Sequence, residues 1–270
     1  GRLDIMWFDY SFDEYSGDKW KAKELVSMVR KYQPDIILDN RLEINQGTAA
    51  GQRTISFLGD FETPEQGIPE APIVDKYNNP IPWETCLTLN NHWGYNESDK
   101  NWKSPELVIH SLVNCVSKNG NLLLNIGPQA DGAIPTEQKQ VLRDIGAWLQ
   151  VNGEGIYGTR PWKVSGEGTA ELPDESASFN EYKSKGYTEE DIRFTQKGDL
   201  LYAFVLGVPS RKIVIRALAA EKDSPKIASI SLLGSSVQPN WKQTGNALTI
   251  EPNEHYACEH AVAFKITFHD

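Results

Sequence analysis

The sequence has few cysteines, no long hydrophobic run and no excess of basic residues, and each absence excludes a class of protein. Three cysteines in 270 residues are too few and too scattered for a disulfide framework, so we expect three buried thiols: Cys86, Cys115 and Cys258. No run of 18 apolar residues occurs, so no membrane-spanning helix is predicted. The formal net charge of −10 argues against nucleic acid or an anionic membrane as a partner, because both attract basic surfaces.

The signatures of several other chemistries are missing as well. The sequence has neither a glycine-rich phosphate loop nor a Gly-x-Ser-x-Gly nucleophile elbow. His255, Cys258 and His260 lie close together, but their spacing fits no standard zinc site, and we interpret this segment as structural. We therefore expect neither a metal nor an organic cofactor. No signal peptide stands at the front of the sequence.

The first 155 residues alternate between strand patterns and helical patterns, as in parallel α/β folds. The apolar run Ile5–Phe8 predicts a strand buried on both faces, and Asp18 is a candidate N-cap for the helix that follows. Further strands are expected at 36–38, 84–89 and 122–126, and further helices at Ser104-Pro105 and at Pro135. Four strands alternating with helices form half of an eight-stranded barrel. The apolar face expected for the first helix consists of Trp20, Leu25, Met28 and Val29.

The pattern changes after about residue 155. Short alternating or β-branched runs, separated by turn signals, are typical of an antiparallel β-sandwich. We expect strands at 191–195, 200–206, 212–215, 227–232, 247–250 and 262–268. The predicted domains are therefore 1–155, the second half of a (β/α)8-like barrel, and 156–270, a C-terminal β-sandwich.

Carboxylates occur where a barrel places its active site. Asp9 directly follows the first strand, and the active sites of parallel α/β barrels lie at the C-terminal ends of their strands. A turn or helix cap at a strand end explains many such aspartates, and taken alone Asp9 fits that role more often than a catalytic one. Glycoside hydrolysis requires a second carboxylate, and the long polar stretch 43–82 supplies several. Spacing alone does not choose among Asp60, Glu62, Glu65 and Glu70.

One arginine and several aromatic residues are candidates for binding a sugar. Arg41, at the end of the second strand, is suited to hold a sugar hydroxyl or to lower the pKa of a carboxylate, although a surface ion pair explains it equally well. Sugars pack their C–H patches on aromatic faces, which makes Trp7, Trp83, Trp93 and Tyr95 candidates. Core packing is the more frequent role of tryptophan. Trp93 stands out because it lies in a polar segment just after a strand.

Five short motifs, taken in order, resemble those of glycoside hydrolase family 29, the α-L-fucosidases. The resemblance covers roughly residues 5–162, and the C-terminal region matches in kind more than in motif. The motifs are Met6-Trp7-Phe8-Asp9, Asp39-Asn40-Arg41, Gly59-Asp60-Phe61-Glu62-Thr63-Pro64-Glu65, His92-Trp93-Gly94-Tyr95 and Asn121-Leu122-Leu123-Leu124-Asn125-Ile126-Gly127-Pro128.

The resemblance implies a retaining exo-hydrolase that removes terminal α-L-fucose from fucosylated oligosaccharides or glycoconjugates. It places the nucleophile on Asp9 and the general acid/base on Glu65. Trp7, Arg41 and Trp93 fall on positions that line the fucose pocket in similar enzymes. The family also implies a secreted, periplasmic or lysosomal location.

One departure from the family pattern concerns histidine. The barrel of the family begins with strands that carry an adjacent histidine pair, whereas none of the five histidines here is adjacent to another. We expect the first half of the barrel to be a separate chain or to be absent from this sequence, because half a barrel exposes sheet edges. The alternatives are another retaining barrel glycosidase, α-galactosidase-like or fucan-active, and a non-catalytic carbohydrate-binding protein. The presence of both Asp9 and Glu65 counts against the latter.

Overall fold

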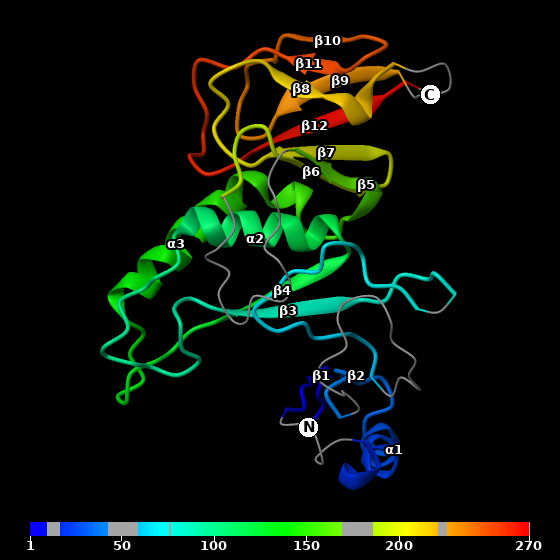
Figure 1. Cartoon of the computed structure of the whole chain (residues 1–270), viewed down its shortest axis with the longest axis vertical. Coiled ribbons are helices and arrows are strands. Elements are labelled where there is room, and N and C mark those ends of the chain that lie inside the picture. The colour runs from blue at the N-terminus through cyan, green and yellow to red at the C-terminus, as the bar shows by residue number, and fades with distance from the viewer. Residues whose placement is uncertain (10–16, 43–58, 76, 169–185, 221–225, 270) are drawn as a thin grey trace. The chain divides into compact units, whose positions relative to one another are not determined.

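The computed structural model describes residues 1–9, 17–42, 59–75, 77–168, 186–220 and 226–269 (Figure 1). Contacts divide the chain into two compact units, and each is described by itself. The first contains the described residues of Gly1–Leu87 and Asn119–Leu123. The second contains those of Thr88–Lys118, Leu124–Asp174 and Asn180–Asp270. These two compact units are not the two domains predicted from the sequence, and the domain boundary near residue 155 stays a prediction.

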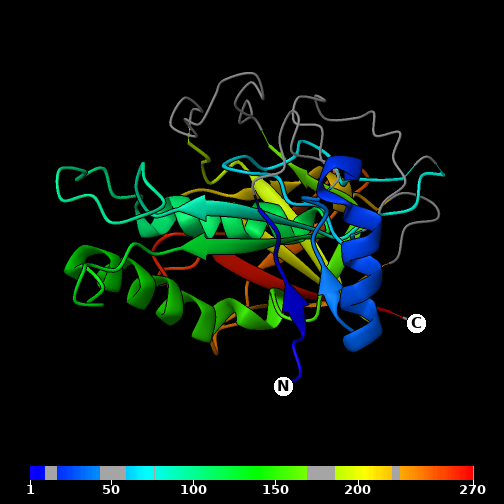
Figure 2. The ribbon, with the colours of Figure 1, turned by 90° about the horizontal axis from the view of Figure 1, so that it is seen from below.

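The first unit begins with a parallel β-α-β arrangement. Strand β1 (Ile5–Met6) pairs in parallel with β2 (Ile37–Leu38), and helix α1 (Ala22–Tyr32) connects them. Figure 2 shows α1 beside the two strands. The connection confirms the predicted strand–helix–strand order. The apolar cluster that holds it together is Ala22, Val26, Ile36, Leu38 and Leu42.

Two details of this arrangement differ from the prediction. The helix is preceded by a 3-10 turn, η1 (Gly17–Trp20), so its N-cap is Lys21 and not Asp18. Because of this turn, Trp20 is out of phase with the helical stripe and lies 41% exposed, while Ala22 and Val26 are buried. Met28, also expected on the buried face, is 51% exposed.

The first strand is also shorter and less buried than predicted. Its ladder with β2 ends at Met6, and Ile5 is 56% exposed. Beyond Met6 the backbone leaves the ladder, and the amide of Phe8 donates instead to the side chain of Asp39. The residues that follow β1 are therefore positioned by side chains.

Isolated bridges extend the pairing from β2 towards β3. Asp39 pairs in parallel with Phe61, and Glu62 pairs in parallel with Trp83, so residues 61–62 lie between the two strands. β3 (Trp83–Thr88) then pairs with β4 (Gly120–Asn125), close to the predicted strands. A Cβ at Gly120 would lie 2.3 Å from the ring of Trp83, so only glycine leaves room for this tryptophan. Trp83 is 0% exposed and is a core residue, not a sugar-binding candidate.

The second unit contains two helices and an antiparallel β-structure. Helix α2 (Pro105–Ser117) begins as predicted, with the Ser104 hydroxyl accepting from the amide of Leu107, and α3 (Thr136–Asn152) follows Pro135. The 3-10 turns are η2 (Gly153–Gly155) and η4 (Arg216–Leu218). One sheet has the order β5 (Arg160–Glu167), β6 (Ile192–Lys197), β7 (Leu200–Val205), β12 (Val262–Phe268) and β9 (Ile227–Leu232). The other has the order β10 (Trp241–Gln243), β11 (Leu248–Ile250) and β8 (Ile213–Ile215).

A shared apolar core joins the two sheets into a sandwich. Phe194 and Phe264 of the larger sheet and Leu248 of the smaller one belong to the same buried cluster. All six predicted strands are present, whereas β5 and β10 were not predicted. Pro161 lowers the strand signal of β5, whose register shifts between Pro161 and Gly166, and β10 has only three residues.

The helices α2 and α3 pack on the sandwich within the second unit, as Figure 1 shows for α2 beside β5 and β6. The Trp148 indole N–H donates to the carbonyl of Ala261 at 2.8 Å. Cys258 accepts from the Asn152 amide and is only partly buried, so the expectation of three buried thiols is wrong at this position. Among the described residues, no three or more of His, Cys, Asp or Glu gather as they would around a metal ion. No helix in the described ranges is long and apolar enough to cross a membrane.

Candidate active site

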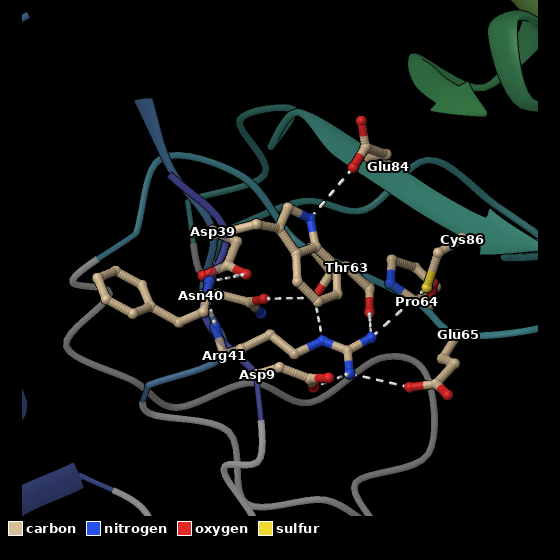
Figure 3. Close-up of polar contacts among 11 residues, drawn as sticks. Asp9, Asp39, Asn40, Arg41, Thr63, Pro64, Glu65, Glu84 and Cys86 are labelled. Atoms are coloured by element: carbon tan, nitrogen blue, oxygen red, sulfur yellow. Dashed lines mark hydrogen bonds and ion pairs between the residues drawn. The ribbon is translucent and has the colours of Figure 1, made fainter. Parts of the chain in front are cut away.

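Arg41 joins the two carboxylates predicted for catalysis. Its Nη1 donates to Oδ1 of Asp9 at 3.2 Å and to Oε2 of Glu65 at 2.9 Å. Figure 3 shows the guanidinium between these two side chains, which come from the segment that follows β1 and from the stretch that precedes β3. The structure therefore brings together three of the predicted site residues that lie far apart in the sequence.

The guanidinium of Arg41 is held on its other sides. Its Nε donates to the Thr63 hydroxyl at 2.9 Å, and its Nη2 donates to the Thr63 carbonyl at 3.3 Å. The Cys86 sulfur accepts from Nη2 at 3.7 Å, and the ring of Trp7 lies 4.5 Å from the guanidinium carbon. These contacts fix the plane of the guanidinium, so the positions of its two carboxylate partners are coupled.

Exposure differs sharply across this group. The side chain of Arg41 is 7% exposed, whereas those of Asp9 and Glu65 are 57% and 32% exposed. The cation is thus part of the protein interior, and the carboxylates face outward, where a ligand can reach them. Trp7 is half-buried, and its indole N–H donates to Glu84 at 3.2 Å. Burial raises the pKa of Glu84, while the bond from Trp7 lowers it.

Glu65 owes its position to backbone pairing with β3. It forms a parallel bridge with Cys86, the Gln66 amide donates to the Cys86 carbonyl at 3.0 Å, and the Cys86 amide donates to the Pro64 carbonyl at 3.2 Å. Burial raises the pKa of the Cys86 thiol to about 11, so this thiol is neutral and serves as a packing group. The stretch that carries Glu65 is therefore anchored to β3 by backbone hydrogen bonds.

The other carboxylates of this stretch are occupied elsewhere or lie in solvent. Both oxygens of Asp60 accept from Arg30 on α1 at 2.9 Å. Glu62 is buried and accepts from the Asn40 amide at 2.6 Å. Glu70 is exposed. Glu65 instead shares the guanidinium of Arg41 with Asp9.

Asp39 is a member of this group that the sequence reasoning did not single out. Its carboxyl is buried at 3% exposure and accepts from the Phe8 amide at 2.9 Å and from the Arg41 amide at 3.4 Å. Burial raises the pKa of Asp39 to about 7, and the charge of Asp9 adds to this, while the two amides and the Arg41 charge lower it. The signal that could have found it is the one used for Asp9, a carboxylate directly after an apolar strand.

Trp93, the third predicted substrate-binding residue, belongs to the second unit. It is 40% exposed, its carbonyl accepts from the Asn125 amide at 2.8 Å, and Tyr95 nearby is 39% exposed. The adjacent His92 bonds through Nδ1 to the buried Asp99 at 2.7 Å. The assignment of Trp93 to the same site as Asp9 stays a prediction.

Comparison with known proteins decides the family. A family model described as alpha-L-fucosidase matches residues 1–154, which is more than half of the chain. The chain belongs to the α-L-fucosidase family. A second family model, described as the alpha-L-fucosidase C-terminal domain, matches residues 185–267. The resemblance to glycoside hydrolase family 29 is thereby confirmed.

Curated α-L-fucosidases match parts of this family member. The alpha-L-fucosidase of Branchiostoma floridae is 30% identical over 185 residues, which cover 66% of the chain and 36% of that protein. The plasma alpha-L-fucosidase of Rattus norvegicus is 43% identical over 96 residues, which cover 33% of the chain and 21% of that protein. The chain thus matches less than half the length of each of these relatives.

Solved α-L-fucosidase structures share the fold. Alpha-L-fucosidase isoenzyme 1 from Paenibacillus thiaminolyticus aligns with a TM-score of 0.80 and 34% identity, over 100% of this chain and 59% of that one. The Thermotoga maritima alpha-fucosidase in complex with fucose aligns with a TM-score of 0.69 and 26% identity, over 97% of this chain and 51% of that one.

Proposed function

We propose that the protein is a retaining exo-α-L-fucosidase that removes terminal α-L-fucose from fucosylated oligosaccharides or glycoconjugates. The observation that carries the proposal is the pair of bonds from one nitrogen of Arg41 to Asp9 and to Glu65. Family membership supports the substrate class, and the similar Thermotoga maritima enzyme has been solved with fucose bound.

The shared donor nitrogen of Arg41 keeps the two carboxylates close together. Because both bonds end on Nη1, the two acceptor oxygens lie within about 6 Å of each other, which is compatible with the roughly 5–5.5 Å carboxyl separation of retaining glycosidases. Inverting enzymes hold the carboxyl groups roughly 6.5–9.5 Å apart to admit a water molecule.

The reaction then proceeds by double displacement. Asp9 bonds to the anomeric carbon while the glycosidic C–O bond breaks, and the proton of Glu65 passes to the leaving oxygen. In the second step Glu65 takes a proton from water, the water oxygen bonds to the anomeric carbon, and the ester to Asp9 breaks. The positive charge of Arg41 offsets the repulsion between the carboxylates, and Trp7 contributes an aromatic face to the fucose pocket. Trp93 is proposed as a further substrate-binding residue.

The architecture proposed for this activity is a barrel followed by a sandwich. Residues 1–155 form the second half of the (β/α)8 barrel, and residues 156–270 form the C-terminal β-sandwich. The first half is supplied outside these residues, as a separate chain or as further sequence. Apolar residues in β1, in β2 and just before β1 support this, since Ile5, Ile37 and Leu3 are 56%, 44% and 52% exposed. We propose a secreted, periplasmic or lysosomal location.

The test uses the protein expressed from its complete gene. It is assayed with an aryl α-L-fucoside and with the corresponding aryl α-D-galactoside, while NMR follows the anomer released first. The proposal predicts hydrolysis of the fucoside with α-L-fucose as the first product. Preference for the galactoside would indicate a different retaining glycosidase, and β-L-fucose as the first product would exclude retention. Binding of fucose without turnover would indicate a carbohydrate-binding protein.

A further inference from the structure

The backbone that carries Asp9 lies outside the sheet ladder. β1 and β2 are paired only through Ile5–Ile37 and Met6–Leu38, and the chain then continues through Trp7 and Phe8. An amide beyond the ladder needs another acceptor if it is to be held in place. The amide of Phe8, the residue before Asp9, donates to Oδ2 of Asp39 at 2.9 Å.

Asp39 is itself held firmly. It forms a parallel bridge with Phe61, and its second oxygen faces the Arg41 amide at 3.4 Å. A Cβ at Gly59 would lie 2.2 Å from the Asp39 carbonyl oxygen, so the backbone at Gly59 packs directly on it. The acceptor of the Phe8 amide is therefore a fixed point, and its burial excludes competition from solvent.

We propose that Asp39 is a positioning residue that sets the location of Asp9 relative to the anomeric carbon, through its hydrogen bond to the Phe8 amide. The inference rests on the proposed function, in which Asp9 is the nucleophile. Asp39 is 3% exposed and accepts from the backbone amides of Phe8 and Arg41, so it is expected to act through the backbone and not on the substrate itself. The same carboxyl links Phe8 to the Arg41 backbone, so it ties the strand end that carries the nucleophile to the one that carries the shared cation.

This role makes a kinetic prediction that a general loss of structure does not. Displacing a nucleophile slows its attack on every substrate, whatever the leaving group, whereas removing an acid slows departure of basic leaving groups most. Azide replaces the water activated by the base, so it does not repair a slow first step. Loss of Asp39 is therefore expected to lower kcat equally on aryl and natural fucosides, with little change in KM and without rescue by azide.

The experiment compares Asp39→Ala and Asp39→Asn in the complete enzyme. We expect Asp39→Ala to lower kcat about 10²-fold on both substrates, the scale of a misplaced reacting group. Asp39→Asn keeps an amide oxygen for the Phe8 N–H, and we expect it to retain kcat within about tenfold, on the scale of the ~1 kcal/mol of one hydrogen bond. If Asp39→Ala does not fold, Asp39→Ser, which is also too short to reach the amide, is measured in its place.

Asp60→Ala is the matched control. Asp60 also accepts a backbone amide of the second strand, that of Leu38 at 2.8 Å, but its other contact is Arg30 and not the nucleophile segment. We expect its kcat to stay near that of the unchanged enzyme. The inference is overturned if Asp39→Ala retains full kcat, if Asp60→Ala loses as much, or if azide restores Asp39→Ala. If Asp9→Ala remains active in the same assays, it is the proposed function that fails instead.

Discussion

The residues around Arg41 and the core of the sandwich differ in the kind of side chain that they bury. Beside the strand ends, the residues with less than one-tenth exposure include five polar or charged ones: Asp39, Asn40, Arg41, Glu62 and Thr63. In the sandwich, the residues with no exposure include Phe194, Phe204 and Phe264. Apolar burial stabilises a fold without fixing a chemical geometry, whereas buried polar groups contribute little net stability and must be fully bonded.

We therefore expect the residues around Arg41 to determine activity and the sandwich core to determine stability. Each buried polar group near Arg41 has a partner that also orients it, as Thr63 does for Arg41 and Asn40 does for Glu62. Substitution of an exposed partner of Arg41, such as Asp9, is expected to change kcat more than the free energy of unfolding. Substitutions in the sandwich core are expected to lower the free energy of unfolding and to leave the kcat of the folded enzyme unchanged.

Removing the nucleophile is the largest expected effect. Asp9→Ala should lower kcat by roughly 10⁴-fold or more, the scale of nucleophile removal in other hydrolases. Its side chain is 57% exposed, so loss of its ion pair with Arg41 should lower the free energy of unfolding by no more than about 1 kcal/mol. Steady-state kinetics and thermal unfolding measure the two quantities. Asp4→Ala, an exposed aspartate just before the same strand, should leave both unchanged; a matched loss of stability and activity in Asp9→Ala would mean a structural cap.

Removing the acid/base is expected to have a smaller effect that depends on the substrate. Glu65→Ala should slow hydrolysis of a natural fucosylated oligosaccharide by roughly 10²–10⁴-fold more than the first step on an aryl fucoside, because a nitrophenolate leaves without a proton. Added azide should give an α-L-fucosyl azide, because azide displaces Asp9 from the β-linked intermediate with inversion. Glu70→Ala, at an exposed carboxylate of the same stretch, is the control. Equal losses on both substrates without an azide product would exclude Glu65 as the acid/base.

A core substitution in the sandwich should show the reverse pattern. Phe264 is 0% exposed within the apolar cluster, so Phe264→Ala should lower the free energy of unfolding by about 3–5 kcal/mol. The kcat of the remaining folded enzyme should be unchanged. Val214→Ala, at a 41% exposed position of the other sheet, should cost much less. Denaturant titration with activity per folded molecule tests this, and a drop in kcat would show that the two regions are coupled.

The smallest expected effect concerns stability as a function of pH. The pKa of Asp39 is raised from its ordinary value to about 7, so the folded chain binds this proton more tightly than the unfolded chain does. Its contribution to stability is therefore full below about pH 4 and is lost as the pH rises through about 7, a change of a few kcal/mol at most. Asp39→Asn should remove this part of the pH dependence, measured by denaturant unfolding between these limits. Identical slopes in both proteins would contradict the assignment.

Regular patterns in the sequence made most of the fold predictable. Ser104-Pro105 carries a helix-start signal that the structure uses directly, and the alternating run at Val262–Phe268 forms the strand β12 as predicted. The two predictions of secondary structure that failed have the same cause. A 3-10 turn shifted the start of the first helix to Ala22, and Pro161 masked β5, because both depend on local geometry that hydrophobic periodicity does not encode.

The site was predictable only in part. Asp9 follows a strand, and a barrel alone suggests its role, whereas Glu65 could be chosen among four carboxylates only by family resemblance. The structure separates them physically, because Asp60 faces Arg30 and Glu62 is buried against Asn40. These pairings join residues about 20 to 30 positions apart, and no local pattern reveals them.

The central claim is that Asp9 forms a covalent bond with fucose. The test incubates the complete enzyme with 2-deoxy-2-fluoro-α-L-fucosyl fluoride. The fluorine at C2 slows hydrolysis of the fucosyl–enzyme ester, so the ester accumulates. Peptide mass spectrometry then locates the residue that carries it. We predict a single 2-fluorofucosyl adduct on Asp9, lost in Asp9→Ala and retained in Glu65→Ala. An adduct on Glu65 or on any other residue, or inactivation without a covalent adduct, would contradict the account.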